Sequence, residues 1–310
     1  MLFCSYIVDV PNISVVITTY NRAGLLPRAI ESAKSAGSDL EVIVVDDCST
    51  DDTAEVCATI SGIRHVRLNE NGGLANARNV GIAESSSEFV AFLDDDDLRL
   101  PGSLDKQLHA MTADDRIALC YGQALIGDAR RQLPTGEIYP LKCPAGDIFW
   151  ELLEDNFIPM PTVLTRKSNM LSEDCFDTNM SLVEDWDMWL RLSERFLIAA
   201  IEEPVAIHRK AIAESGQMCS NPAELCKQAL HTQQMALDRP RAQAAAGAKR
   251  KYVRRKFRDR VYEILMTEAS SSINQGDAGS ARINIRDAFR YRPLRTVASG
   301  RLLWLLGRLR

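Results

Sequence analysis

Four consecutive aspartates, Asp94–Asp97, form the densest group of ionisable side chains in this 310-residue sequence. They follow EFVAFL at 88–93, an apolar run that is typical of a buried strand. Adjacent carboxylates repel one another, so some of them must be protonated, solvated or bound to a cation. A hard divalent ion with oxygen ligands, Mg²⁺ or Mn²⁺ bridging to a diphosphate, would remove that repulsion. A solvated loop without metal is the alternative.

A second pair of carboxylates, Glu184 and Asp185, stands at the start of a segment whose periodicity predicts a helix over 184–195. A carboxylate in such a position can take a proton from an attacking hydroxyl group and so act as a general base. The alternative is that both acids only stabilise the first helical turn through the helix dipole.

Further polar side chains follow two other strand-like runs. Thr18, Tyr20 and Arg22 come at the end of the run at 13–18, and Asp46-Asp47 follows the run at 40–45. The ring of Tyr20 can stack on a nucleobase, and the carboxylate of Asp47 can accept hydrogen bonds from a base or a ribose hydroxyl. The alternatives are a helix N-cap for the aspartates and an ordinary core or surface aromatic for Tyr20.

These side chains can form one site only if the fold brings the ends of their strands close together. The sequence predicts four strands separated by helices, over 13–18, 40–45, 63–68 and 88–93. Repeated strand–helix–strand units favour a parallel, doubly wound α/β sheet. Ligands bind such sheets at the carboxyl ends of the strands, so we expect the polar groups to converge there.

The signals are weaker beyond residue 100. The pattern predicts helices over 103–113 and 184–195, strands over 117–126 and 161–165, proline-rich loops over 134–161, and a closing edge strand from Pro204 to His208. From Asn221 onward the pattern is helical, with an apolar stripe at Val253, Phe257, Val261, Ile264 and Leu265.

Five segments in order resemble the GT-A fold glycosyltransferases of family 2, which are inverting enzymes that use nucleotide-diphospho-sugars. The segments are ISVVITTYNR at 13–22, EVIVVDDCSTDDT at 41–53, NGGLANARNVGI at 71–82, EFVAFLDDDD at 88–97 and VEDWDMWLRL at 183–192. The resemblance covers residues 1–210. It implies a Rossmann-like, mainly parallel sheet flanked by helices, and transfer of a sugar, with a UDP-sugar favoured, to a glycan or lipid-linked acceptor in surface polysaccharide or lipopolysaccharide synthesis.

Carried over residue by residue, the resemblance implies the site. We expect nucleotide-sugar binding by Thr18, Tyr20, Arg22, Asp47, Arg78, Asp94 and Asp95, a Mn²⁺ or Mg²⁺ ion held by Asp96 and Asp94, and a general base at Asp185. One position departs from the family pattern. Many relatives carry a metal-binding histidine where this sequence has Ala211, so either the metal relies on Asp96, phosphate and water, or Arg209 and Lys210 assist the leaving group.

The resemblance also implies a domain plan. We expect a catalytic domain over 1–215, with a nucleotide-binding half at 1–100 and an acceptor-binding half at 101–215, followed by a basic helical region at 216–310.

Two other functions compete with the transferase. A sugar-phosphate nucleotidyltransferase would begin with a glycine-rich phosphate loop, which TTYNRAGLL at 18–26 does not reproduce. A non-catalytic member that only binds nucleotide-sugars is disfavoured by Asp47, Asp96 and Asp185.

The charge is divided unevenly along the chain. Residues 249–310 hold 16 basic and 5 acidic side chains, whereas residues 1–248 hold 21 and 37. Arg282, Arg286 and Arg290 repeat at helical spacing beside Ala281, Ile285, Ala288 and Phe289, and Arg301, Arg308 and Arg310 surround LLWLLG. This tail predicts peripheral attachment to an anionic membrane, with a solvated helical face as the alternative and no nucleic-acid partner.

No apolar run approaches the ~20 residues of a membrane-spanning helix, and the N-terminus lacks the features of a signal peptide. We therefore expect a cytosolic protein. The eight cysteines contain no C-x-x-C pair, so we expect reduced thiols.

Overall fold

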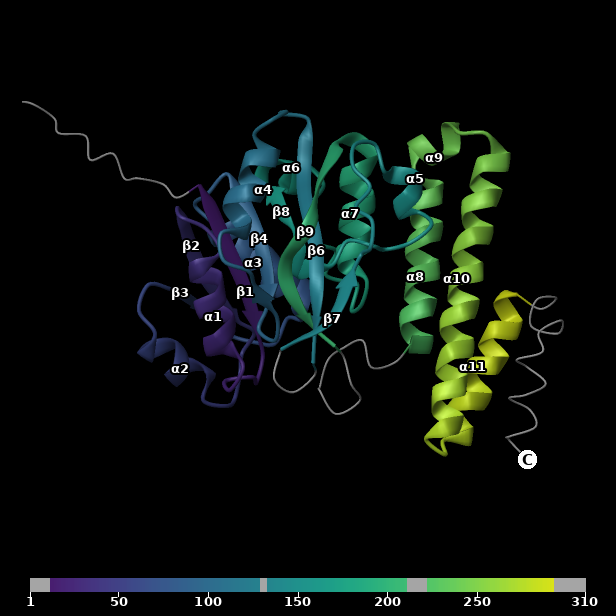
Figure 1. The fold of residues 1–310 in the computed structure, drawn as a ribbon, viewed down its shortest axis with the longest axis horizontal. Coiled ribbons are helices and arrows are strands. Elements are labelled where there is room, and N and C mark those ends of the chain that lie inside the picture. Colours follow the sequence, from purple (N-terminus) through teal and green to yellow (C-terminus); the bar gives the residue numbers. More distant parts are fainter. Residues whose placement is uncertain (1–11, 129–132, 211–221, 293–310) are drawn as a thin grey trace, which may run out of the picture. The chain divides into compact units, whose positions relative to one another are not determined.

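The computed structural model describes residues 12–128, 133–210 and 222–292. The chain forms two compact units. The first contains residues 1–148 and 157–210, and the second contains residues 149–156 together with 211–310. Figure 1 shows a strand-rich first unit and a helical second unit.

Four parallel strands form one half of the sheet of the first unit, in the order β3-β2-β1-β4. They are β1 (Ile13–Thr19), β2 (Leu40–Asp46), β3 (Arg64–Arg67) and β4 (Phe89–Asp94). Every residue of β1 is buried, as expected for a β-branched run covered on both faces. The four strands and their order along the chain confirm the prediction from the sequence.

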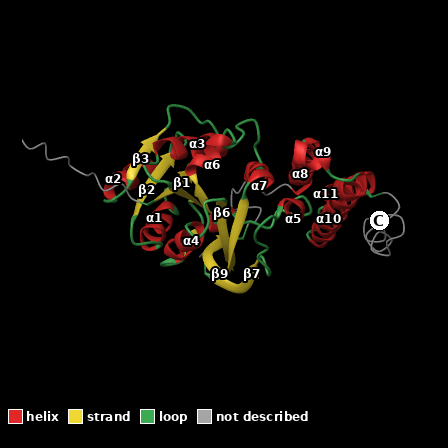
Figure 2. Ribbon diagram, turned by 90° about the horizontal axis from the view of Figure 1, so that it is seen from above, coloured by secondary structure: helices red, strands yellow, loops and turns green. Residues whose placement is uncertain are grey.

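Helices cover both faces of this sheet, and Figure 2 shows α1 and α4 on one face with α3 and α6 on the other. The helices of this unit are α1 (Leu26–Ser35), α2 (Thr53–Thr59), α3 (Leu74–Glu84), α4 (Ser103–Met111), α6 (Lys167–Ser172) and α7 (Glu184–Arg195). A glycine allows α3 to lie close to β1. A Cβ atom added to Gly81 would be 2.2 Å from Cγ1 of Val16, which is closer than packed atoms approach.

The other half of the sheet is mixed. It continues from β4 in the order β8-β6-β9-β5, and β7 pairs with β6. These strands are β5 (Leu98–Arg99), β6 (Ile117–Gly127), β7 (Pro134–Tyr139), β8 (Leu164–Arg166) and β9 (Leu197–Arg209), and a short 3₁₀ turn η1 (Met160–Thr162) precedes β8. Strand β8 is antiparallel to both β4 and β6, whereas β6 and β9 are parallel.

Two expectations for this half are wrong. The closing edge strand at 204–208 is part of the longer β9, which lies between β6 and β5. Pro204 is tolerated inside it because it stands at a register shift opposite Gln123, where the ladder is already irregular. The loops at 134–161 contain β7, whose first five residues are exposed and therefore show no apolar alternation in the sequence.

The second unit is built from helices. They are α5 (Phe149–Leu152), α8 (Pro222–Asp238), α9 (Pro240–Ala244), α10 (Gly247–Asn274) and α11 (Ala278–Tyr291). The predicted stripe on α10 is confirmed at Val253, Phe257, Val261 and Leu265, which are buried. Residues 149–156 belong here because Arg241 stacks on Phe149, Lys249 stacks on Trp150 and Gln233 donates a hydrogen bond to the Leu153 carbonyl. Among the described residues, no helix has the length and apolar character needed to cross a membrane.

Candidate active site

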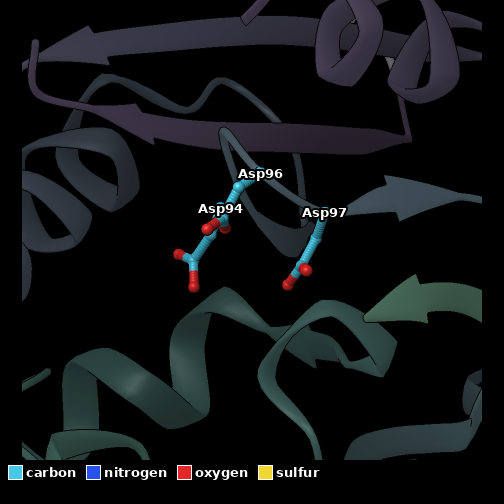
Figure 3. A group of neighbouring side chains, drawn as sticks. All are labelled: Asp94, Asp96 and Asp97. Atoms are coloured by element: carbon cyan, nitrogen blue, oxygen red, sulfur yellow. The ribbon is translucent and has the colours of Figure 1, made fainter. Parts of the chain in front are cut away.

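The acidic turn after β4 is the centre of the candidate site. Asp94, Asp96 and Asp97 each offer a carboxylate oxygen, and these oxygens lie within 4.8 Å of one another. Figure 3 shows the three side chains on this one turn. Asp95, Asp96 and Asp97 are buried, while Asp94 is partly exposed. The fold therefore gathers the carboxylates that the sequence predicted would act together.

Arginines from two other strand ends neutralise this turn. Arg22, which follows β1, donates to Asp95 at 3.0 Å and to Asp96 at 2.9 Å. Arg209, the last residue of β9, donates to the same oxygen of Asp96 at 2.7 Å and 3.2 Å. Burial raises the pKa of Asp95 to about 7, although Arg22 opposes that shift.

Asp97 is held by two groups from the end of β9. The backbone N–H of Arg209 donates to its Oδ1 at 2.7 Å, and Nδ1 of His208 lies 3.2 Å from its Oδ2. The charge of Asp97 raises the pKa of His208 to about 9, and burial raises the pKa of Asp97 above its ordinary range. His208 is thus a strand residue, as predicted, and also a partner of the acidic turn.

Arg78 connects the acidic turn to α7. Its side chain is buried, and its guanidinium donates to Asp94 at 2.9 Å and to Glu184 at 2.5 Å. Thr18 adds a longer hydrogen bond to the same oxygen of Asp94, at 3.4 Å. Burial alone would lower the pKa of Arg78, but the carboxylates of Asp94 and Glu184 hold it above its ordinary value. The arginine therefore stays charged and joins residues far apart in the sequence.

Asp185 stands beside this network at the first turn of α7. It is half-buried, and its Oδ1 accepts the backbone N–H of Trp186 at 2.6 Å. Burial, followed by the neighbouring charge of Glu184, raises the pKa of Asp185 to about 7, while Arg78 opposes the rise. A carboxyl group that titrates near neutrality is suited to act as a general base.

The backbone before this acid pair is unusual. Val183, the N-cap residue of α7, has φ +59° and ψ +18°, in the left-handed region that β-branched residues rarely adopt. Its side chain makes no capping hydrogen bond. The strained residue sets the direction from which the chain enters α7 and therefore where Glu184 and Asp185 begin.

The predicted nucleoside-binding residues lie at the neighbouring strand ends. Tyr20 is 46% exposed, which leaves its ring accessible for stacking. Asp47 is buried, and its two carboxylate oxygens accept the backbone N–H groups of Gly72 at 2.7 Å and Gly73 at 2.9 Å. Gly73 has φ +83°, a conformation that glycine adopts without strain. Asp47 thus fixes the turn that enters α3, a role that the sequence did not predict.

Hydrogen bonds join Arg78 with Thr18, Asp94 and Glu184 in one group, and Arg22 with Asp95 and Asp96 of the same acidic turn in another. Asp185 lies next to the first group. Arg209 and His208 were missed as direct partners of the carboxylates, although the basic run HRK at the end of a strand was a signal for them. Ala211 lies outside the described residues.

Oxygen ligands from Asp94, Asp96 and Asp97 suit a hard ion such as Mg²⁺ or Mn²⁺. The mutual repulsion that predicted a cation is, however, already offset by Arg22, Arg78, His208 and Arg209. Of the three carboxylates, Asp97 has both oxygens engaged by protein groups. The donor set therefore fits a metal, which Asp94 and Asp96 would hold beside the arginines that already bind them.

Comparison with known proteins gives a consistent result. The profile of the family described as "Glycosyl transferase family 2" matches residues 14–171. A GalNAc(5)-diNAcBac-PP-undecaprenol beta-1,3-glucosyltransferase of Campylobacter jejuni is 39% identical over 123 residues, 37% of this chain and 39% of that protein. The succinoglycan biosynthesis protein ExoO of Rhizobium meliloti is 39% identical over 107 residues, 34% of this chain and 31% of that protein.

The relatives that match over a longer part of this chain have names that specify neither a donor nor an acceptor. An uncharacterized glycosyltransferase of Rickettsia bellii is 31% identical over 197 residues, which cover 63% of this chain and 28% of that protein. The chain spans between 28% and 32% of the length of this and two other Rickettsia relatives.

Among solved structures, residues 1–349 of S. aureus TarS in complex with UDP-GlcNAc match with a TM-score of 0.60 at 19% identity, over 96% of this chain and 88% of that one. At this identity the likeness shows the fold alone, which is the GT-A fold expected from the sequence.

Proposed function

Because the chain belongs to family 2 of the glycosyltransferases, we propose that it transfers a sugar from a nucleotide-diphospho-sugar to an acceptor hydroxyl with inversion. The observation that carries this proposal is the pairing of the acidic turn after β4 with Asp185, through Arg78 and Glu184. A group that can bind the donor and a group that can take the acceptor proton thereby lie at one site.

The residues have different roles in a single displacement reaction at the anomeric carbon. The acceptor oxygen attacks the anomeric carbon, the bond from that carbon to the diphosphate oxygen breaks, and Asp185 takes the proton of the hydroxyl. A divalent ion bound by Asp94 and Asp96 would supply positive charge to the departing diphosphate. Arg22 and Arg209 both donate to Asp96 and can supply charge-assisted hydrogen bonds to phosphate oxygens.

A UDP-sugar is the proposed donor. Tyr20 offers an exposed ring for the base, and Asp47 fixes the turn at Gly72 and Gly73. The TarS neighbour was solved with UDP-GlcNAc, which supports a uridine nucleotide without identifying the sugar used by this chain.

For the acceptor, we propose a glycan or lipid-linked hydroxyl in the synthesis of a surface polysaccharide or lipopolysaccharide. The names of two relatives support this class, since one concerns succinoglycan biosynthesis and the other an undecaprenol-linked glycan. Such an acceptor would place the enzyme at the inner face of the cytoplasmic membrane, as a peripheral protein.

A panel of nucleotide-sugars tests the function. Binding of a donor should raise the melting temperature, because a ligand that binds only the folded chain stabilises it by mass action. The same donor should then be hydrolysed slowly without acceptor and transferred with one. Binding without either reaction would favour a non-catalytic nucleotide-sugar-binding protein, and no response to any nucleotide-sugar would contradict the proposal.

The metal has its own test. Affinity for the nucleotide should rise with Mn²⁺ or Mg²⁺, and Asp96→Asn should reduce it by about 10-fold to 100-fold, the range found when metal sites lose supporting groups. Isothermal titration with and without EDTA measures both effects. Asp114→Asn is the control, because Asp114 pairs with Arg116 at the surface and not with the acidic turn. Equal affinity in EDTA and in Mn²⁺ would exclude a metal-bridged donor.

A further inference from the structure

The first half of α10 carries an unusual concentration of positive charge. Residues 249–260 hold eight basic side chains and one acidic side chain, Asp259. Several of the basic groups have partners within the second unit: Arg250 donates to Gln243, Arg254 donates to Gln234 and Arg260 pairs with Asp155.

Three of the basic groups form an exposed strip. Lys251, Arg255 and Arg258 are exposed, and their spacing places them on one face of the helix. Within the parts of the chain that the structure describes, none of the three pairs with a carboxylate. Like charges at this spacing destabilise a helix, so the strip costs stability unless an anionic partner covers it.

The same face of α10 is covered further along by α11. The helical spacing continues from Arg258 to Tyr262, Met266 and Ala269, which are buried, and Arg292 beyond the end of α11 pairs with Asp259 at 2.9 Å. Figure 1 shows α11 alongside the later part of α10. Helix α11 therefore ends beside the strip, and its outer face is the one opposite the buried residues Ala281, Asn284 and Ala288.

That outer face combines apolar and basic side chains. Ile283 and Phe289 are 47% and 48% exposed, and Arg286 and Arg290 lie between and beside them. Of the apolar residues that the sequence places beside the arginines of this helix, Ala281 and Ala288 are buried, whereas Phe289 is exposed. On α10, Tyr252 is also exposed, with Arg255 and Lys256 stacked on its ring.

The chain's own C-terminal segment is a poor occupant for this surface. Residues 293–310 contain Arg295, Arg301, Arg308 and Arg310 and no acidic residue, so they would add to the positive charge. A bilayer with anionic headgroups offers negative charge to the basic strip. It also offers an apolar layer in which exposed apolar side chains can be buried. A nucleic acid would satisfy only the charge.

We propose that the strip of Lys251, Arg255 and Arg258, together with the outer face of α11, binds an anionic phospholipid surface. The inference deepens the proposed function by naming the surface that attaches the enzyme to a membrane. It places the main contact on α10, whereas the sequence pattern had pointed to the arginines between residues 282 and 310. Vesicle binding is measured without any sugar transfer, so failure of this inference and failure of the transferase proposal are distinguishable.

The test is cosedimentation of the full-length chain with vesicles of phosphatidylcholine, with and without phosphatidylglycerol. The triple variant Lys251→Gln, Arg255→Gln, Arg258→Gln should reduce the partition coefficient about a hundredfold on the anionic vesicles. The matched control is Arg28→Gln, Lys106→Gln, Lys142→Gln, which removes the same charge from exposed positions of the first unit and should bind like the unchanged chain.

A second variant removes apolar groups instead of charge. Ile283→Ser with Phe289→Ser should weaken binding to the same vesicles while lowering the melting temperature only slightly, because about half of each side chain is exposed. Equal binding to neutral and anionic vesicles, or equal loss in the two triple variants, would overturn the inference. Retained vesicle binding with loss of affinity for duplex DNA in the α10 variant would also overturn it, in favour of a nucleic-acid partner.

Discussion

Asp185→Asn should lower kcat for sugar transfer by roughly 10²-fold to 10⁴-fold, the usual contribution of a general base. The amide keeps an oxygen that can accept the Trp186 N–H but cannot take a proton from the acceptor. Donor affinity should survive, since the acidic turn and the strand ends that would hold the nucleotide belong to other elements. If the acid only stabilised its helix, turnover would be nearly unchanged.

The pH dependence gives an independent measure of the same group. With the pKa of Asp185 raised to about 7, the base is protonated below that pH and free to accept a proton above it. Transfer by the unchanged chain should therefore increase with pH up to about 7 and then level off. The residual rate of Asp185→Asn should lack this rise. A profile that is flat from pH 5 to 8 in the unchanged chain would contradict the assignment.

Stability separates a catalytic role from a structural one. Between its ordinary pKa of 3.8 and about 7, Asp185 in the folded chain retains a proton that the unfolded chain releases. The free energy of unfolding therefore falls as pH rises through this range, and the charged carboxylate disfavours the fold above it. At pH 8, Asp185→Asn should melt at or above the temperature of the unchanged chain. A marked loss of melting temperature would indicate that the residue mainly supports the helix.

Glu184→Gln is the matched comparison. Glu184 is buried and bound to Arg78, so Glu184→Gln should affect the free energy of unfolding more than it affects kcat. Near-normal turnover in Asp185→Asn with collapse in Glu184→Gln would move the base to Glu184. Normal turnover in both variants would remove the assignment altogether.

Arg78→Met should reduce the free energy of unfolding by about 3–5 kcal/mol, because removing one partner of a buried ion pair leaves the other charge uncompensated. Here two carboxylates, Asp94 and Glu184, lose their shared guanidinium. Methionine replaces the apolar stem of the arginine side chain but not its guanidinium, so the loss mainly reports the missing charge. Urea unfolding of the two chains at pH 7 measures the difference.

Two further variants interpret that result. Arg116→Met removes an arginine from an exposed pair with Asp114, where no measurable loss is expected. Adding Glu184→Gln to Arg78→Met should recover part of the lost stability, because one of the two uncompensated charges is then absent. A loss of similar size in Arg78→Met and Arg116→Met would show that the buried ion pairs contribute no more to stability than the exposed pair.

In the parallel half of the sheet, β1, β2 and β4 were predictable because each contains a run of buried, mostly apolar residues. Ile13–Thr19 and Leu40–Asp46 are buried almost throughout, so local composition is enough to find them. In the other half, the exposed residues of β7 and the acidic residues inside β9 break the apolar pattern by which a strand is predicted. Both strands are held in place by pairing with β6. Their place depends on neighbours that a local window does not contain.

The acids of the site were predictable for the same local reason, since they follow strand ends or begin a helix. Their counter-ions were not. Arg209 lies 113 residues from Asp96, and Glu184 lies 106 residues from Arg78. The charge on four adjacent aspartates appears uncompensated in the sequence, whereas the fold supplies basic partners from several elements. Only the packing of distant segments decides whether a cluster needs a cation from solution.

The hydrogen atom that serves as the side chain of Gly81 has a consequence beyond packing. Gly81 follows Arg78 by three residues on α3 and lies against Val16 of β1. A methyl group at position 81 would push the helix away from the sheet and carry the guanidinium with it, away from an oxygen it now meets at 2.9 Å. The close approach of Gly81 to β1 therefore sets the position of the Arg78 guanidinium one turn earlier on the same helix. Gly81→Ala should alter catalysis although residue 81 contacts no ligand.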